Sequence, residues 1–243
     1  MIILAIVLGL LPGFAWLYFY LKEDSHPEPK KLIAVVFFLG VLATLLAFML
    51  QCLTLTTFFS FKSCEVDLDV AVGNLPFIGG VILLTVMALI EELIKFGAAR
   101  TAVKRNTNFD EPVDAMVYMV VVALGFATVE NFAVSQKILD PSLLLSGATT
   151  VYDALRTISM RFIGATLLHT LASGIVGYYW AKSIRDFGNK ADLAKGLILA
   201  TLLHAFFNYL IIGLGDRIYT VVLLFVVGLI VIADFEKLKR RRI

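Results

Sequence analysis

Six ionisable side chains lie inside stretches of this sequence that are otherwise apolar. They are three glutamates, two histidines and a lysine, namely Glu91, Glu92, Lys95, Glu130, His169 and His204. A single charge at the centre of a bilayer costs about 2.5–3.5 kcal/mol on insertion scales, so such groups persist where they pair, bind a metal or line a hydrated cavity. We therefore expect the function of the chain to reside in this cluster.

The first three of these residues form a short motif, with Glu91 and Glu92 followed by Lys95. On a helix the lysine is four residues from Glu91 and three from Glu92, so it shares a face with both. One lysine can neutralise one carboxylate and leave the other available for chemistry. The alternative is a structural ion pair at a helix end, which Arg100 and Lys104 downstream support, although two adjacent acids in an apolar helix cost more than an anchor requires.

Glu130 stands in a second apolar stretch, one helical turn after Phe126 and directly before Asn131. No lysine lies within a turn on its N-terminal side, and Lys137 is nearly two turns further on. The carboxylate must therefore find a partner on another helix or hold a proton. Single glutamates of this kind also occur in transporters and in structural networks.

His169 and His204 stand near the middle of two further apolar stretches. A lone buried histidine is more often a satisfied core residue than a ligand, but two of them beside three intramembrane acids favour a functional role. Asn208 lies one turn after His204 on the same face. It is positioned to orient the imidazole or to donate to a developing oxyanion.

Two kinds of hydrolytic chemistry fit these residue types. Two imidazoles and a carboxylate form a suitable ligand set for Zn²⁺ with one open position for water, while another glutamate acts as general base. Alternatively, a glutamate aided by histidine activates water without a metal, and the asparagine and the lysine stabilise the oxyanion. The sequence leaves both open. It has no G-x-S-x-G, Gly-rich phosphate loop or H-E-x-x-H motif, the markers of serine hydrolases, nucleotide-binding loops and zincins.

The segments that must position these residues are membrane spans. The chain has 243 residues, of which 60% are hydrophobic and only 16% are charged, unlike a soluble globular domain. Apolar runs of about 20 residues, long enough to cross a hydrocarbon core of about 30 Å, recur seven times. Their limits are about 2–20, 32–59, 70–99, 113–133, 158–181, 193–213 and 218–233. We predict an all-α, polytopic transmembrane bundle of about seven helices that forms a single domain over residues 1–243.

Basic residues concentrate in alternate connections and in the C-terminal run 236–243, a distribution that gives the chain its net charge of +2. The positive-inside rule then places the N-terminus outside and the C-terminus in the cytoplasm of a multi-pass protein of the cell membrane. The first span lacks the basic start and cleavage site of a signal peptide, so we expect it to be retained. No basic face or binding module indicates a nucleic-acid partner.

The chain has two cysteines, Cys52 near the end of the second span and Cys64 in the connection that follows. We expect two unpaired thiols, with a disulfide as the alternative if that connection faces an oxidising compartment. The longest external connection is 137–156, and its leucine run 143–145 is expected on the membrane surface or in a short re-entrant piece.

These motifs together resemble the PrsW family of membrane-embedded proteases. The resemblance rests on Glu91-Glu92-x-x-Lys95, the run from Glu111-Pro112 through Gly125-Phe126 to Glu130-Asn131, the His169 helix and His204-x-x-x-Asn208, and it covers about residues 20 to 210. That family is similar to the CAAX-processing and bacteriocin-processing membrane endopeptidases. The second motif ends here in Glu130, where the CAAX-processing relatives have histidine, which argues against prenylated substrates.

The resemblance implies an endopeptidase that cuts membrane-anchored protein substrates at or within the lipid bilayer, in some members an anti-sigma factor. It implies that Glu91 and Glu92 hold the catalytic base. Glu130, His169 and His204 would be proton-transfer partners or ligands of Zn²⁺ or another divalent metal. The supporting residues would be Lys95, Phe126, Asn131 and Asn208.

Two other functions compete with this hypothesis. A proton-coupled transporter also uses intramembrane acids and histidines, but it predicts duplicated, pseudo-symmetric halves, which the sequence lacks. A catalytically silent member would keep the residues as a polar scaffold. Convergence of Glu91 or Glu92 with both histidines would favour catalysis. The predicted spans leave Glu130 about 10 Å or more from the depth of the other groups, which we interpret as a boundary error.

Overall fold

The computed structural model describes residues 1–23, 27–64, 66–185, 189–215 and 217–239, and within them the chain is helical with no β-strand. The elements are α1 (Ile2–Glu23), α2 (Lys30–Phe58), α3 (Leu68–Gly73), α4 (Phe77–Val103), α5 (Asp114–Ile138), α6 (Pro141–Leu145), α7 (Val151–Ile163), α8 (Ala165–Arg185), α9 (Lys190–Asn208), the π-helical turn η1 (Tyr209–Gly213) and α10 (Arg217–Lys239). Seven helical segments of this described part are long and apolar enough to cross a membrane. The predicted all-α class and the number of spans are thus confirmed.

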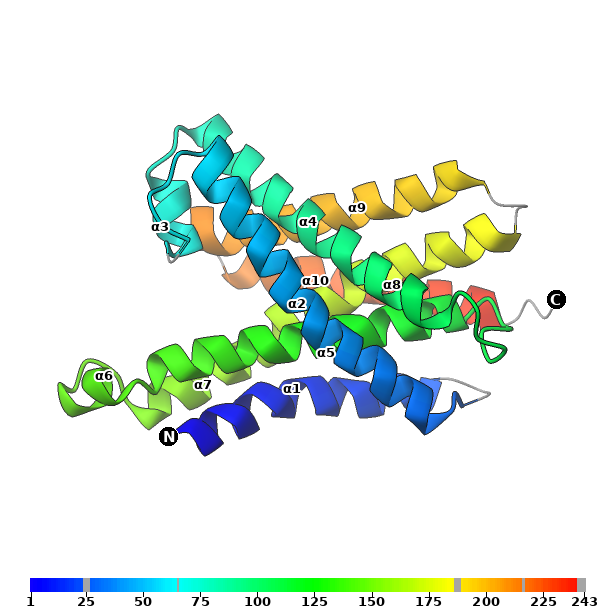
Figure 1. The fold of residues 1–243 in the computed structure, drawn as a ribbon, viewed down its shortest axis with the longest axis horizontal. Coiled ribbons are helices and arrows are strands. Elements are labelled where there is room, and N and C mark those ends of the chain that lie inside the picture. Colours follow the sequence, from blue (N-terminus) through cyan, green and yellow to red (C-terminus); the bar gives the residue numbers. More distant parts are fainter. Residues whose placement is uncertain (24–26, 65, 186–188, 216, 240–243) are drawn as a thin grey trace.

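Helix α5 is the centre of the bundle and packs against α1, α2 and α8. Almost all of its first four turns are buried, and in Figure 1 it runs between the blue α1 and α2 and the yellow-green α8. Gly40 on α2 faces the Val122 carbonyl, and Gly125 on α5 faces the Phe37 carbonyl, so a Cβ at either glycine would overlap the opposing backbone. These glycines let α2 cross α5 closely.

Two of the predicted spans are interrupted in the structure. The predicted span 70–99 is divided, because α3 ends at Gly73 and Pro76 caps the start of α4 at Phe77. A proline has no N–H for a helical hydrogen bond, and it disfavours helical backbone in the residue before it. The predicted span 158–181 is divided at Gly164, whose φ of −92° and ψ of −96° are not helical. On either side of that break, α7 packs against α1, α5 and α8, whereas α8 packs mainly against α5, α9 and α10.

The predicted fourth span, 113–133, ends five residues too early, since α5 continues to Ile138. Glu130 therefore lies about two turns inside the end of its helix, which removes most of the depth conflict seen in the sequence. The leucine run 143–145 belongs to the short helix α6, and Leu145 is 89% exposed.

The expectation of two unpaired thiols was wrong, because Cys52 and Cys64 form a disulfide with their Cα atoms 4.8 Å apart. The chain turns back after α2 to pack Phe59 and Phe61 against a small apolar core around Leu83 of α4. That turn returns Cys64 to the side of α2. The spacing of the two cysteines in the sequence does not specify how close they come in space. The disulfide joins the last part of α2 to the connection before α3, and Figure 1 shows α3 at the end of the bundle that also holds the N-terminus.

Candidate metal and catalytic site

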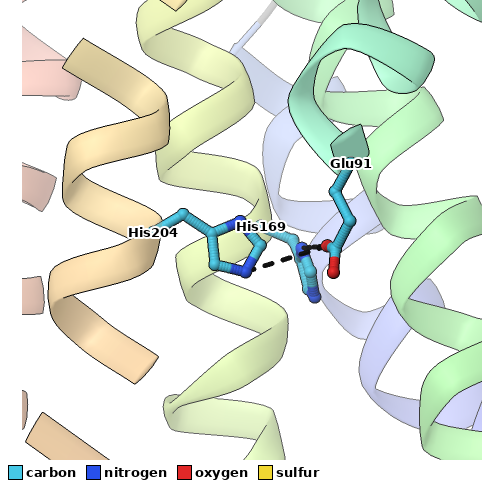
Figure 2. A group of neighbouring side chains, drawn as sticks. All are labelled: Glu91, His169 and His204. Carbon is cyan, nitrogen blue, oxygen red and sulfur yellow. Dashed lines mark ion pairs between the residues drawn. The ribbon is translucent and has the colours of Figure 1, made fainter. Parts of the chain in front are cut away.

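The ionisable side chains from four helices meet inside the bundle. Glu91, Glu92 and Lys95 extend from α4, while Glu130, His169 and His204 come from α5, α8 and α9. All of them except Glu130 are buried. Figure 2 shows the Glu91 carboxylate directed toward both imidazole rings.

Glu92 is fully buried, and three donors surround its carboxylate. Lys95 Nζ lies 2.6 Å from Oε1, and His204 Nδ1 lies 2.9 Å from the same oxygen. The Ser173 hydroxyl lies 3.5 Å from Oε2. The sequence predicted that the lysine neutralises one of the two carboxylates, and in the structure that carboxylate is Glu92. Glu92 therefore links α4 to α8 and α9 and has little remaining capacity to accept a proton from water.

Glu91 differs from its neighbour because one of its oxygens has no hydrogen bond. Oε1 accepts from Gln51 Nε2 at 3.0 Å, whereas buried Oε2 has no partner among the described residues. Around Oε2 lie His204 Nε2 at 3.7 Å, His169 Nδ1 at 3.8 Å and Lys95 Nζ at 3.9 Å. An unsatisfied buried carboxylate oxygen is costly, and it commonly marks the place of a water or an ion.

The partners of the two histidines assign their tautomers. An ionised carboxylate only accepts, so His204 Nδ1–H donates to Glu92 and its Nε2 keeps a lone pair toward Glu91. His169 Nε2–H donates to Glu130 Oε2 at 2.9 Å, which leaves the lone pair on Nδ1. Each imidazole is thus held on one side by a carboxylate, and its other nitrogen lies toward Glu91; for His169 that nitrogen, Nδ1, also lies 3.0 Å from Lys95 Nζ.

This donor set fits a divalent metal ion. Ligand atoms of Glu91, His169 and His204 all lie within 4.8 Å of one another. Zn–N and Zn–O bonds of about 2.0–2.1 Å place tetrahedral ligands about 3.3 Å apart, and the observed 3.7 and 3.8 Å are close to that spacing. A carboxylate on the far nitrogen of each ligating histidine is also typical of metal sites. Lys95 Nζ, 3.0 Å from His169 Nδ1, would have to turn toward Glu92 as a cation binds.

The group overlaps only in part with the predicted ligand set. His169 and His204 belong to it, but Glu130 contacts the other nitrogen of His169, on the side away from Glu91. The geometry therefore favours Glu91 as the third ligand and gives Glu130 the task of orienting His169. Because histidine has two ring nitrogens, a carboxylate in contact with the ring is not necessarily beside the metal.

The predicted supporting residues also surround this centre. The Phe126 ring lies 5.6 Å from the His169 ring, and Lys95 Nζ lies 5.0 Å from the Phe126 ring centroid. Phe126 therefore packs against both groups. Asn208 lies in the wall of the adjacent cavity, while the hydrogen bond described for His204 runs to Glu92. The imidazole is thus oriented by a carboxylate and not by the asparagine.

Arg161 is a site residue that the sequence reasoning missed. Its Nη2 donates to Glu130 Oε2 at 3.0 Å, and its Nε donates to Asn131 Oδ1 at 2.5 Å. Asn131 in turn donates to Thr166 Oγ1 at 3.0 Å. The signal was present, since Arg161 is an arginine inside a predicted span and such a residue needs a partner. Gln51 was missed because an uncharged amide is less conspicuous.

A cavity of about 820 Å³ adjoins the cluster. Its inner wall includes Glu91, Glu130, His169 and His204, and Arg161 and Asn208 also line it. The remaining walls come mainly from α7, η1 and α10. The buried donor set is therefore accessible from outside the helix bundle.

Comparison with known proteins agrees with this geometry. The model of the PrsW family intramembrane metalloproteases matches residues 28–233 of the chain. The chain belongs to the PrsW family. It is 30% identical over 211 residues to Protease PrsW of Geobacillus kaustophilus, covering 84% of this chain and 78% of that relative. It is 29% identical over 218 residues to Protease PrsW of Bacillus subtilis, covering 87% and 84% respectively.

Membership in the PrsW family gives the chain the coarse identity of a multi-pass membrane endopeptidase. No solved structure matches it significantly. Neither of the competing functions, transporter or silent scaffold, is favoured by these relatives.

Proposed function

We propose that this PrsW-family protein hydrolyses peptide bonds of membrane-anchored proteins at the centre formed by Glu91, His169 and His204. The observation that carries the proposal is the buried Oε2 of Glu91, which has no hydrogen bond among the described residues and lies 3.7 Å from His204 Nε2 and 3.8 Å from His169 Nδ1. The sequence resemblance suggests that a membrane-anchored anti-sigma factor is one substrate of this kind.

A divalent cation such as Zn²⁺, held by Glu91, His169 and His204, would lower the pKa of a water molecule and polarise the scissile carbonyl. The charges of the site support such a cation. Glu91, Glu92 and Glu130 carry three negative charges, whereas Lys95 and Arg161 supply two positive ones. The remaining anionic charge is buried beside two imidazoles, an environment in which a cation is stabilising.

The two adjacent glutamates have different tasks in this proposal. Glu91 Oε2 has a free lone pair and faces the cavity, so it is the group that binds the metal or, in a metal-free reaction, accepts the proton of water. Glu92 is a positioning residue, because its oxygens already accept from Lys95, His204 and Ser173.

In the metal-free form of the reaction, Glu91 takes a proton as water attacks the carbonyl carbon and returns it to the leaving amine. Asn208 lines the cavity and carries an amide N–H that can stabilise the oxyanion. Both forms require Glu91, and they differ in their response to metal removal.

The deciding experiment combines cleavage with metal analysis on purified protein in vesicles. Wild-type protein should cleave a membrane-spanning reporter and contain about one metal ion per chain. Removal of the metal with a chelator should abolish cleavage, and Zn²⁺ should restore it. Activity that survives chelation but is lost in Glu91→Gln would support the metal-free route. Full cleavage by Glu91→Gln, at equal protein level, would overturn both routes.

The positive-inside rule leads us to propose that the end of the bundle with the disulfide faces outward. The Cys52–Cys64 disulfide supports this orientation, since disulfides persist in oxidising compartments.

A further inference from the structure

We propose that substrate reaches the site sideways from the bilayer, through a cleft between α7 on one side and η1 with α10 on the other. The occupant is an unwound segment of a membrane-anchored polypeptide. This inference rests on the proposed function and adds the entry route and the conformation of the substrate.

The cleft is the outer part of the 820 Å³ cavity. One wall belongs to α7 and the opposite wall to η1 and α10, with the main lining residues Arg156, Thr157, Met160, Ile211, Val221 and Leu224. Helix α7 packs against α1, α5 and α8, whereas α10 packs against α8 and η1. In the described part of the chain, α7 and α10 have at most marginal contact, so no helix packing closes the space between them.

The backbone of both walls is irregular at the cavity. Gly164, where α7 gives way to α8, lines it, and so do Ile211 and Ile212 of the π-helical turn. Non-helical backbone at membrane depth is tolerated where it is buried in protein or lines a water-filled cavity, and π-helical turns occur frequently at functional sites. Two such irregularities from separate helices at one cavity indicate that water enters here.

The chemistry of the walls identifies the occupant as polypeptide. A transmembrane helix hides its peptide bonds in its own hydrogen bonds, so cleavage requires an unwound segment, and each unsatisfied backbone group in lipid costs several kcal/mol. Arg156 and Thr157 offer polar partners along α7, while Met160, Val221 and Leu224 provide apolar surface for side chains. An unwound peptide has polar groups along its whole length and can use the polar and the apolar parts of these walls together, whereas a lipid acyl chain matches only the apolar part.

Steric obstruction tests the route, and the chain offers a matched control. Val221 and Val222 are neighbours on α10 and both are 54% exposed, but only Val221 lines the cavity. Val221→Trp should lower cleavage of a membrane-spanning reporter peptide by about tenfold or more, mainly through a higher KM. Val222→Trp should stay within about twofold of wild type. On the other wall, Met160→Trp should behave like Val221→Trp, with Met49→Trp on the lipid-exposed surface of α2 as its control.

Crosslinking tests occupancy without requiring catalysis. A photoreactive amino acid at position 221 or 222 of the Glu91→Gln protein is combined with the same reporter in vesicles. Crosslinks to the reporter at 221 and not at 222 support the cleft. Crosslinks at 221 to lipid alone, or equal effects of the two tryptophans on cleavage, overturn it. A wild-type protein that cleaves no reporter, while crosslinks form at 221, contradicts the proposed hydrolysis and leaves the docking surface supported.

Discussion

Arg161 and His169 donate to the same oxygen, Oε2 of Glu130, at 3.0 and 2.9 Å. The two donors belong to α7 and α8, on opposite sides of the break at Gly164. Glu130 therefore joins the two halves of an interrupted span and fixes the ring of His169, so that Nδ1 faces Glu91. The position of α7, one wall of the proposed entry cleft, is thereby connected to the orientation of a proposed metal ligand.

Replacement of Arg161 should reduce activity by misplacing His169. Arg161→Ala leaves Glu130 with His169 alone and removes the donor to Asn131 Oδ1, so we expect metal affinity and cleavage to fall by about 10–100-fold. Arg100→Ala, at the exposed end of α4, is the control and should change cleavage by less than about twofold. Unchanged metal affinity in Arg161→Ala would show that the arginine does not position His169.

The two adjacent glutamates should separate activity from stability. Glu91→Gln should fold with near wild-type stability, because the amide oxygen can still accept from Gln51. Glu92→Gln leaves the fully buried Lys95 without its charged partner, and breaking a buried ion pair in this way costs about 3–5 kcal/mol. Thermal unfolding in detergent provides the comparison, and an equal loss of stability in both variants would contradict the assigned roles.

Metal titration should distinguish Glu91 from Glu130 as the third ligand. Glu91→Gln should abolish high-affinity Zn²⁺ binding, whereas Glu130→Gln should weaken it by about 10–100-fold through the misplaced His169. Zn²⁺ at about 1,000 times its dissociation constant should stabilise the wild-type fold by about 4 kcal/mol. The reverse order of the two variants would support the ligand set predicted from the sequence.

Loss of the disulfide should destabilise the fold more than it impairs the chemistry. The cysteines are separated by 12 positions, and closing a loop of this size stabilises a fold by about 3 kcal/mol. The double variant Cys52→Ser/Cys64→Ser should show a loss of this order in denaturant unfolding. Its loss of cleavage should be smaller, because Gln51, which is next to Cys52, can still donate its hydrogen bond to Glu91. Unfolding of the wild-type protein in reducing agent should match it. Identical stability with and without reductant would contradict the disulfide.

The sequence by itself determined the class of the protein and the identity of its polar cluster. The hydrocarbon core of a bilayer requires long apolar helices, so the seven spans can be predicted from the apolar runs of the sequence. It also makes each intramembrane charge energetically costly, so that such a charge indicates a functional or paired group. Helical periodicity also placed Lys95 beside Glu92, because both lie on one helix. These features depend on the local chain and on the solvent, and neither requires knowledge of packing.

Only the tertiary structure decided which carboxylate is free, which ring nitrogens face it and what holds them. The hydrogen bonds from His169 Nε2 and Arg161 to Glu130 join different helices. The environment of the Glu91 oxygen that has no hydrogen bond is likewise formed by several helices. Such contacts depend on the depth and rotation of each helix. These are set by the close α2–α5 crossing, by the breaks at Gly164 and before Phe77, and by the turn that pairs Cys52 with Cys64. Residue spacing along one helix carries no information about the rotation of its neighbour. For that reason the sequence identifies the residues of the site but does not predict the contacts between them.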